Sequence, residues 1–196
     1  QYTHYIFNGR IIKPRLVAAG LKFSGNLCDA VIAPSEKMRD DLVSFGITKP
    51  VTVIPNFINR DPGVKPERGF LRETLAIPEN DLIMLAVGRL AKEKNFPFLI
   101  RAFEKTAKKF PSTHLVIVGS GNEKNNLSAL IRKQQHRSRI HLIGKVPPEK
   151  MPFVYKDADV FVFSSTTEVH SMAVLEAASA GLPFIVVKDT SYKDII

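Results

Sequence analysis

The chain from residue 82 onward alternates short apolar runs with longer amphipathic stretches. The apolar runs predict buried strands, and the stretches with apolar residues at helical spacing predict helices between them. Alternating strands and helices predict an α/β domain built on a parallel, doubly wound sheet, whose ligands bind at the carboxyl ends of the strands. We expect strands at 82–87, 115–118, 140–143, 160–163 and 184–187, and helices at 96–110, 123–135, 148–155 and 171–180.

The first 57 residues predict part of a second α/β domain. Apolar runs at 29–34 and 51–55 flank a helix at 36–45, for which Ser35 is the expected N-cap and Gly46 the expected end. Strand, helix and strand in this order form a βαβ unit with parallel strands.

The segment 59–67 is rich in proline, glycine and charge, so it predicts a linker, and a short helix is expected at 67–75. The chain thus divides into the end of an N-terminal Rossmann-like domain at 1–57, a linker region at 58–80, and a C-terminal Rossmann-like domain at 81–196. We expect both domains to be incomplete, and we expect this piece alone to be inactive.

A basic amphipathic helix is expected at 9–27, because apolar residues recur there at near-helical spacing and no Asp or Glu precedes Asp29. Such a helix can lie on an anionic membrane surface. A surface helix packed on its own domain produces the same pattern, so this alternative stays open. The candidate membrane-docking cations are Arg10, Lys13, Arg15 and Lys22.

Composition narrows the class of protein only modestly. The net charge of +9 favours polyanionic partners, and no apolar run reaches the length of about 20 residues that spans a bilayer. A single cysteine, Cys28, cannot form an internal disulfide and is typical of a reducing compartment such as the cytoplasm. We expect Cys28 to be a buried, small apolar side chain.

Candidate chemistry gathers where the predicted strands end. Gly88-Arg89 follows the strand at 82–87, and Lys94 lies five residues further along the same loop. An arginine makes forked contacts to a diphosphate and a lysine supplies a point charge, while the next helix start adds backbone N–H groups. Two solvated surface cations are the alternative for this loop alone.

Three further positions carry weaker signals. Gly119-Ser-Gly121 follows the next strand and is by itself only a tight turn that permits close backbone approach. Glu168 follows the strand at 160–163, and Glu176 lies eight residues on, inside an alanine-rich helix. A carboxylate there needs a polar partner, and ribose hydroxyls, a helix cap or a salt bridge would each serve.

Taken together, these residues resemble the family-4 glycosyltransferases. The pattern follows the family's order and spacing over residues 82–196: G-R-L-x-x-E-K at 88–94, V-G-x-G at 118–121, G-x-V at 144–146, A-D-V-F-V-x-S at 158–164, E-x₇-E-A at 168–177 and G-x-P at 181–183. The resemblance implies a GT-B fold, a nucleoside-diphosphate-sugar donor, transfer with retained anomeric configuration, and no metal or other cofactor.

The resemblance also implies roles for particular residues. Arg89 and Lys94 would hold the diphosphate and stabilise the leaving group, and Glu168 would contact the donor sugar or its phosphate, which makes these three the candidate catalytic residues. Glu176 would bind ribose, and Val146 would meet the base through its backbone. Donor contacts are also expected at Gly88, Gly119, Gly121, Ser171 and Met172. The family usually has E-x-F-G where this chain has Glu168-Val-His-Ser171, so the Cβ of Ser171 stands where glycine permits close approach.

The first 57 residues are similar to bacterial diacylglycerol glucosyltransferases in three places, Y-T-H-Y-I at 2–6, C-D-A-V-I-A-P-S at 28–35 and V-I-P-N at 53–56. This similarity implies UDP-glucose as donor, a diacylglycerol acceptor, and a peripheral position on the inner face of the membrane. Two alternatives stay open, a family-4 enzyme with a soluble or polysaccharide acceptor, and a non-catalytic basic binding module. Nucleic acid is not an expected partner, because no recognition-helix pattern occurs.

Overall fold

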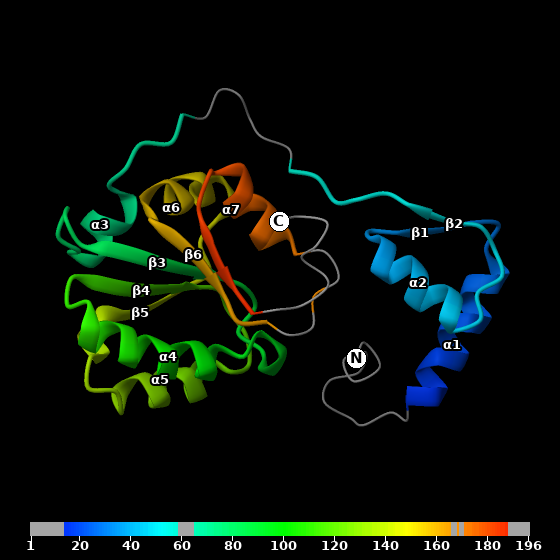
Figure 1. Ribbon diagram of the computed structural model, residues 1–196, viewed down its shortest axis with the longest axis horizontal. Coiled ribbons are helices and arrows are strands. Elements are labelled where there is room, and N and C mark those ends of the chain that lie inside the picture. Colours follow the sequence, from blue (N-terminus) through cyan, green and yellow to red (C-terminus); the bar gives the residue numbers. More distant parts are fainter. Residues whose placement is uncertain (1–13, 59–64, 166–167, 169–170, 188–196) are drawn as a thin grey trace. The chain divides into compact units, whose positions relative to one another are not determined.

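The computed structural model describes residues 14–58, 65–165, 168 and 171–187 (Figure 1). These residues form two compact units, the first containing residues 14–57 and the second residues 58–165 and 172–187. Glu168 and Ser171 group with the first unit. The Y-T-H-Y-I segment, residues 9–13 of the predicted basic helix, most of the linker, His170 and residues 188–196 lie outside the described part of the chain.

The first unit contains the predicted βαβ element. Strand β1 (Val31–Ala33), helix α2 (Glu36–Ser44) and strand β2 (Val51–Val53) follow in that order, and the two strands pair in parallel. Ser35 adopts extended backbone angles, and its hydroxyl accepts a hydrogen bond from the backbone N–H of Met38 at 3.2 Å. The capping residue and the strand order expected from the sequence are therefore confirmed.

Helix α1 (Pro14–Leu27) packs on the turn between α2 and β2. The Asn26 side chain accepts from the backbone N–H of Thr48 at 2.8 Å and donates to the carbonyl of Gly46 at 3.1 Å. A Cβ on Gly25 would meet the side chain of Ile47 at 2.7 Å, so glycine permits this close packing. One side of α1 thus packs against other residues of the first unit.

The interpretation of Cys28 as a buried residue was wrong. Its side chain is exposed, one residue past the end of α1. The thiol lies 3.5 Å from the carbonyl oxygen of Ser24, on the last turn of the helix. The side chain therefore folds back on its own helix and does not enter a core.

The second unit is built on a five-stranded sheet in the order β5-β4-β3-β6-β7, with every neighbouring pair parallel. The strands span Leu82–Val87 (β3), Thr113–Val118 (β4), Ile140–Gly144 (β5), Val160–Phe163 (β6) and Phe184–Val186 (β7). Helices α4 (Phe96–Lys109) and α5 (Lys124–Arg132) cover one face, and α6 (Met151–Asp157) and α7 (Met172–Ser179) cover the other (Figure 1). The predicted doubly wound α/β sheet is confirmed.

The direction of winding reverses beside β3. From β3 the chain proceeds outward to β4 and β5, and then returns to place β6 and β7 on the other side of β3. In doubly wound sheets the ligand crevice opens at the carboxyl ends of the strands that flank such a reversal. The loops after β3 and β6 are therefore the expected walls of a ligand site.

Buried apolar side chains fix this sheet in place. All six residues of β4 are buried, and α4 contributes Phe96, Ile100 and Phe103 to the same core. α4 places these residues at helical spacing, so one side of the helix is apolar and the other meets solvent.

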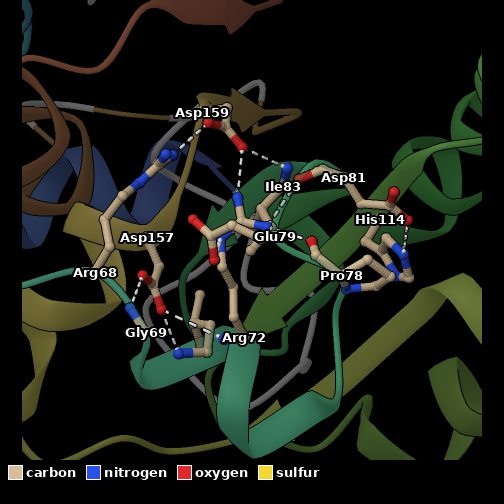
Figure 2. Close-up of polar contacts among 11 residues, drawn as sticks. Arg68, Gly69, Arg72, Pro78, Glu79, Asp81, Ile83, His114, Asp157 and Asp159 are labelled. Carbon is tan, nitrogen blue, oxygen red and sulfur yellow. Dashed lines mark hydrogen bonds and ion pairs between the residues drawn. The ribbon is translucent and has the colours of Figure 1, made fainter.

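A polar network holds the opposite, amino-terminal edge of the sheet (Figure 2). The fully buried Asp157 carboxylate accepts from the backbone N–H groups of Gly69 and Leu71, at the start of the short helix α3 (Phe70–Leu75). From α3, Arg72 reaches the Asp159 carboxylate at 3.3 Å and the carbonyl of Asp81 at 2.9 Å. The aspartate of the A-D-V-F-V-x-S pattern thus ties α3 to the sheet, far from the strand ends that form a site.

Candidate functional site

The loop after β3 carries the first predicted cation. Arg89 is exposed, and its Nη2 lies 2.6 Å from Oε1 of Glu93, whose side chain is only 11% exposed. The pair lies on the turn that enters the short 3₁₀ helix η2 (Lys92–Lys94). Glu93 therefore holds one end of the Arg89 guanidinium. The remaining N–H groups of Arg89 face solvent, where an anion can reach them.

Lys94 lies at the reversal point between β3 and β6. Its Nζ sits 5.4 Å from the centroid of the Phe163 ring, at the carboxyl end of β6. Its side-chain carbons lie 3.8 Å from the place where a Cβ on Gly88 would stand. The lysine stem is thus directed across the ends of both strands, and its ammonium group faces the ring.

Two serines at the end of β6 fix the position of the β3 loop. The hydroxyl of Ser164 donates to the carbonyl of Lys94 at 2.8 Å, and the hydroxyl of Ser165 donates to the carbonyl of Glu93 at 3.3 Å. Both serines are buried, with 2% and 0% of their surface exposed. These bonds join loops that are about seventy residues apart, so the cation-bearing loop is braced before any ligand binds.

The glycines after β4 allow the neighbouring loops to pack together. A Cβ on Gly119 would stand under 3.0 Å from the carbonyl oxygen of Gly88, and a Cβ on Gly121 would also stand under 3.0 Å from the carbonyl oxygen of Leu90. The backbone N–H of Leu90 donates to the carbonyl of Ser120 at 2.9 Å across this contact. The G-x-G signal therefore has a packing reason, which is the close backbone approach that such a turn permits.

Glu176 has a partner that the sequence did not reveal. The Tyr155 hydroxyl, on α6, donates to Oε2 of Glu176, on α7, at 2.6 Å. Burial raises the pKa of Tyr155 above its usual range, and the Glu176 carboxylate raises it further. The phenol consequently stays protonated and occupies one carboxylate oxygen, which leaves the other oxygen to a second donor.

The other predicted residues are placed as follows. Val146 is half-buried in the segment after β5, and Met172 is 43% exposed at the first position of α7. Glu168 and Ser171 are both buried, with 8% and 6% exposed. The structure therefore brings together the loops that carry Gly88, Arg89, Lys94, Gly119 and Gly121, and it places Glu176 on the helix that follows β6.

Only one of the four membrane-docking candidates has a described side chain. Lys22 is exposed on α1, and its stem lies 3.1 Å from the place where a Cβ on Gly46 would stand. Arg10 and Lys13 lie outside the described residues, and of Arg15 only the backbone is described. No helix in the described part of the chain is both long and apolar enough to cross a bilayer.

Sequence reasoning missed Tyr155 and Ser165. Tyr155 ends a predicted helix as one more apolar residue, and nothing in the spacing marks its bond to a carboxylate 21 residues away. Ser165 directly follows a strand, a position that is typical of functional residues. Its partner is a backbone carbonyl, however, and the sequence does not mark such a partner. Both contacts depend on how the strands and helices are ordered in the sheet.

Comparisons with known proteins match both parts of the chain. Residues 67–196 match the family model described as glycosyl transferases group 1, and residues 2–62 match the model described as glycosyltransferase family 4. The alpha-monoglucosyldiacylglycerol synthase of Acholeplasma laidlawii is 30% identical over 95% of this chain and 49% of its own length. The synthase of the same name from Streptococcus pneumoniae is 30% identical over 94% of this chain and 43% of its own length.

A solved structure shares the fold. Anabaena HepE, crystallised in complex with UDP-glucose, superposes with a TM-score of 0.80 at 19% identity, over 99% of this chain and 54% of that one. The chain spans about half the length of the curated relatives it matches.

Proposed function

Because this chain belongs to the glycosyl transferases group 1 family, with the GT-B fold, we propose that it forms the donor-binding part of a hexosyltransferase that glucosylates a lipid. The observation that carries the proposal is the braced loop at the reversal point of the sheet. There Ser164 and Ser165 hold a loop that carries Arg89 and Lys94 beside the carboxyl ends of β3 and β6.

The donor in this proposal is UDP-glucose. Arg89 and Lys94 bind the diphosphate and stabilise the negative charge that grows on it as the sugar leaves. Because the loop is already fixed in position, little reorganisation is needed when that charge develops. The complex of HepE with UDP-glucose supports a nucleotide sugar as the ligand of this fold.

The remaining donor contacts in this proposal come from the segment after β5, from residues just before α7 and from α7 itself. Glu176 accepts hydrogen bonds from the ribose hydroxyls through the oxygen that Tyr155 leaves open. Glu168 contacts the sugar or its phosphate, and the backbone at Ser171 and Met172 meets the sugar hydroxyls. Val146 contacts the base through its backbone. We propose that the reaction retains the anomeric configuration and needs no metal.

The acceptor in this proposal is diacylglycerol in the cytoplasmic face of the cell membrane. The two relatives that share 30% identity are both named alpha-monoglucosyldiacylglycerol synthases, which supports a lipid acceptor and glucose as the sugar. Arg10, Lys13, Arg15 and Lys22 would then place α1 against anionic headgroups.

Calorimetric titration of the chain with UDP tests the donor site. We expect micromolar binding, a loss of at least about tenfold in affinity for Arg89→Ala and for Lys94→Ala, and no effect of a chelator. Lys156→Ala, an exposed cation on α6, is the control and should bind UDP normally. Equal binding by all three variants would contradict the proposed roles of Arg89 and Lys94.

The acceptor and the base are tested separately. A complete two-domain enzyme that contains this chain, supplied with radiolabelled UDP-glucose, should label diacylglycerol in vesicles and leave soluble glucans unlabelled, and GDP should not compete with UDP. Labelling of the glucan alone would identify a family-4 enzyme with a polysaccharide acceptor. Oligonucleotide binding without any nucleotide binding would identify a basic module in place of an enzyme.

A further inference from the structure

The α4 and α5 side of the second unit holds almost all of the chain's net charge. Residues 96–109 and 124–139 contain nine Lys or Arg and one carboxylate, Glu104, a balance of +8 where the whole chain carries +9. α4 and α5 pack side by side on one face of the sheet (Figure 1). Six exposed cations form what we call the cationic face: Arg101, Lys105, Lys108, Lys109, Arg132 and Lys133.

Glu104, the one carboxylate in residues 96–109 and 124–139, is bonded to a residue of the same domain. Glu104 accepts from the backbone N–H of His136 at 3.1 Å, and its other oxygen lies 3.1 Å from Nδ1 of the same histidine. Arg139 donates to the carbonyl of Ala107 at 2.9 Å. Both contacts tie the turn after α5 to the last turns of α4. Within the described residues no ion pair joins the cationic face to a carboxylate.

The spacing of the cations on α4 is unfavourable for an isolated helix. Arg101, Lys105 and Lys108 follow at intervals of four and three residues, so they share one side of the helix. A solvated helix side ordinarily mixes both signs, because like charges at these intervals repel each other. A polyanionic surface opposite the stripe would remove this repulsion.

Exposed aromatic rings stand at both ends of the stripe. Phe98 lies one turn before Arg101, Phe110 follows directly after the helix, and each ring is 52% exposed. The ammonium group of Lys109 lies 5.5 Å from the centroid of the Phe110 ring. Cations flanked by apolar rings are the composition of surfaces that lie in the headgroup region of an anionic bilayer.

We propose that the cationic face docks this domain on an anionic membrane surface, with Phe98 and Phe110 entering the headgroup region. The inference rests on the lipid acceptor of the proposed function and adds a docking surface on the donor-binding domain itself. The two packed helices present their sides, which suits a bilayer, whereas duplex recognition uses a helix that enters a groove. α4 starts directly after Lys94 and Asn95, so a bilayer along α4 lies within one helix length, about 21 Å, of the donor loop.

Tryptophan substitution tests the insertion directly, because the chain contains no tryptophan. Phe98→Trp and Phe110→Trp should each shift their emission to the blue with vesicles of phosphatidylglycerol and phosphatidylcholine, and brominated lipid should quench them. Phe153→Trp, on α6 over the opposite face of the sheet, is the matched control and should do neither (Figure 1). Quenching of the Phe153→Trp variant alone would place the bilayer on the wrong face and overturn the proposal.

Charge reversal tests the cations without touching the core. Lys105→Glu combined with Lys108→Glu should weaken binding to these vesicles by at least about tenfold, and added salt should weaken binding of the unsubstituted chain. Lys150→Glu combined with Lys156→Glu changes the charge equally at exposed positions outside this face and should change binding little. Equal losses in both double variants would mean that net charge, and not this surface, is responsible.

UDP titration of the same samples separates this inference from the proposed function. UDP binding without vesicle binding would overturn the docking surface and leave the donor site standing. Vesicle binding through the cationic face without UDP binding would overturn the donor site and leave the docking surface standing. Tighter binding of the chain to an RNA or DNA duplex than to vesicles, lost in the Lys105 and Lys108 double variant, would assign the face to nucleic acid and overturn the membrane proposal.

Discussion

Glycine has different structural reasons at Gly119, after β4, and at Gly88, after β3. A Cβ on Gly119 would meet a backbone carbonyl at under 3.0 Å, and the residue has a φ of 149°. A Cβ on Gly88 would meet only side-chain atoms, at 3.7 Å and beyond. The first glycine is required by its neighbour's backbone, whereas the second permits a small side chain.

Alanine substitutions should separate these two cases. Gly119→Ala should lower the free energy of unfolding by about 2 kcal/mol or more, because the backbone of one loop must move. Gly88→Ala should cost well under that and should keep the fold. Urea unfolding of both variants measures the difference, and equal losses would show that close approach is not the reason for glycine at residue 119.

Substitution of Tyr155 tests the proposed contact between Glu176 and the ribose. Tyr155→Phe removes the hydroxyl that holds Glu176 and leaves the buried ring, so the fold should survive. UDP affinity should fall by roughly three- to tenfold, the scale of one ordinary hydrogen bond. The loss should be much smaller for UDP that lacks its ribose hydroxyls. A uniform loss for both nucleotides would instead indicate a general change in the pocket.

Some positions of the candidate site could be predicted from the sequence, and others could not. The positions of Arg89 and Lys94 at the strand ends were predictable, because residues that directly follow a buried strand of a parallel sheet lie at its carboxyl edge. Ser165 and Tyr155 were not, since their partners lie on loops and helices that only the strand order brings near. The exposure of Cys28 also could not be predicted, because an apolar neighbourhood in sequence does not fix which way a side chain turns after a helix ends.

At the scale of elements, the hydrophobic periodicity and the positions of glycine, proline and capping residues predicted the strands and helices well. They predicted the ends of these elements less well. β4 begins at Thr113, two residues before the predicted start, because Thr113 and His114 pair with Leu82 and Ile83. α5 ends at Arg132, before the predicted end, and the chain then turns into a short 3₁₀ helix. The start of β4 depends on pairing with another strand, which local periodicity does not contain.

Strands β4 and β5 also carry two histidines in contact, His114 and His141. His114 Nε2 lies 3.0 Å from Asp81, and its Nδ1 lies 3.0 Å from Nε2 of His141. Burial, and then the neighbouring His114, lowers the pKa of His141 from 6.5 to about 4. Between these two values the unfolded chain binds a proton at His141 that the folded chain does not bind.

Stability should therefore fall as the pH drops from 6.5 towards 4, and this effect should be absent above 6.5. His141→Gln keeps an amide donor near His114 and removes the titration, so its stability should depend less on pH over this window. Thermal unfolding at a series of pH values measures both proteins. Identical pH profiles would rule out His141 as a source of the acid sensitivity.

At the scale of the whole molecule, charge and chemistry are distributed unevenly. The second unit carries the braced cationic loop at one edge of its sheet and the cationic face along α4 and α5, while the network of Asp157, Asp159 and Arg72 occupies the opposite edge. The net charge of +9 pointed to polyanionic partners in general. Only the fold revealed that one pair of helices holds most of that charge.

The central claim is that the loops after β3, β4 and β6 bind a nucleoside-diphosphate sugar. Hydrogen exchange of the chain with and without UDP-glucose tests this claim most directly, since each backbone N–H reports on its own position. Exchange should slow at residues 88–95, 119–122 and 172–176 and stay unchanged in β1, α2 and β2. Unchanged exchange at 88–95 in the presence of saturating UDP-glucose would contradict the claim.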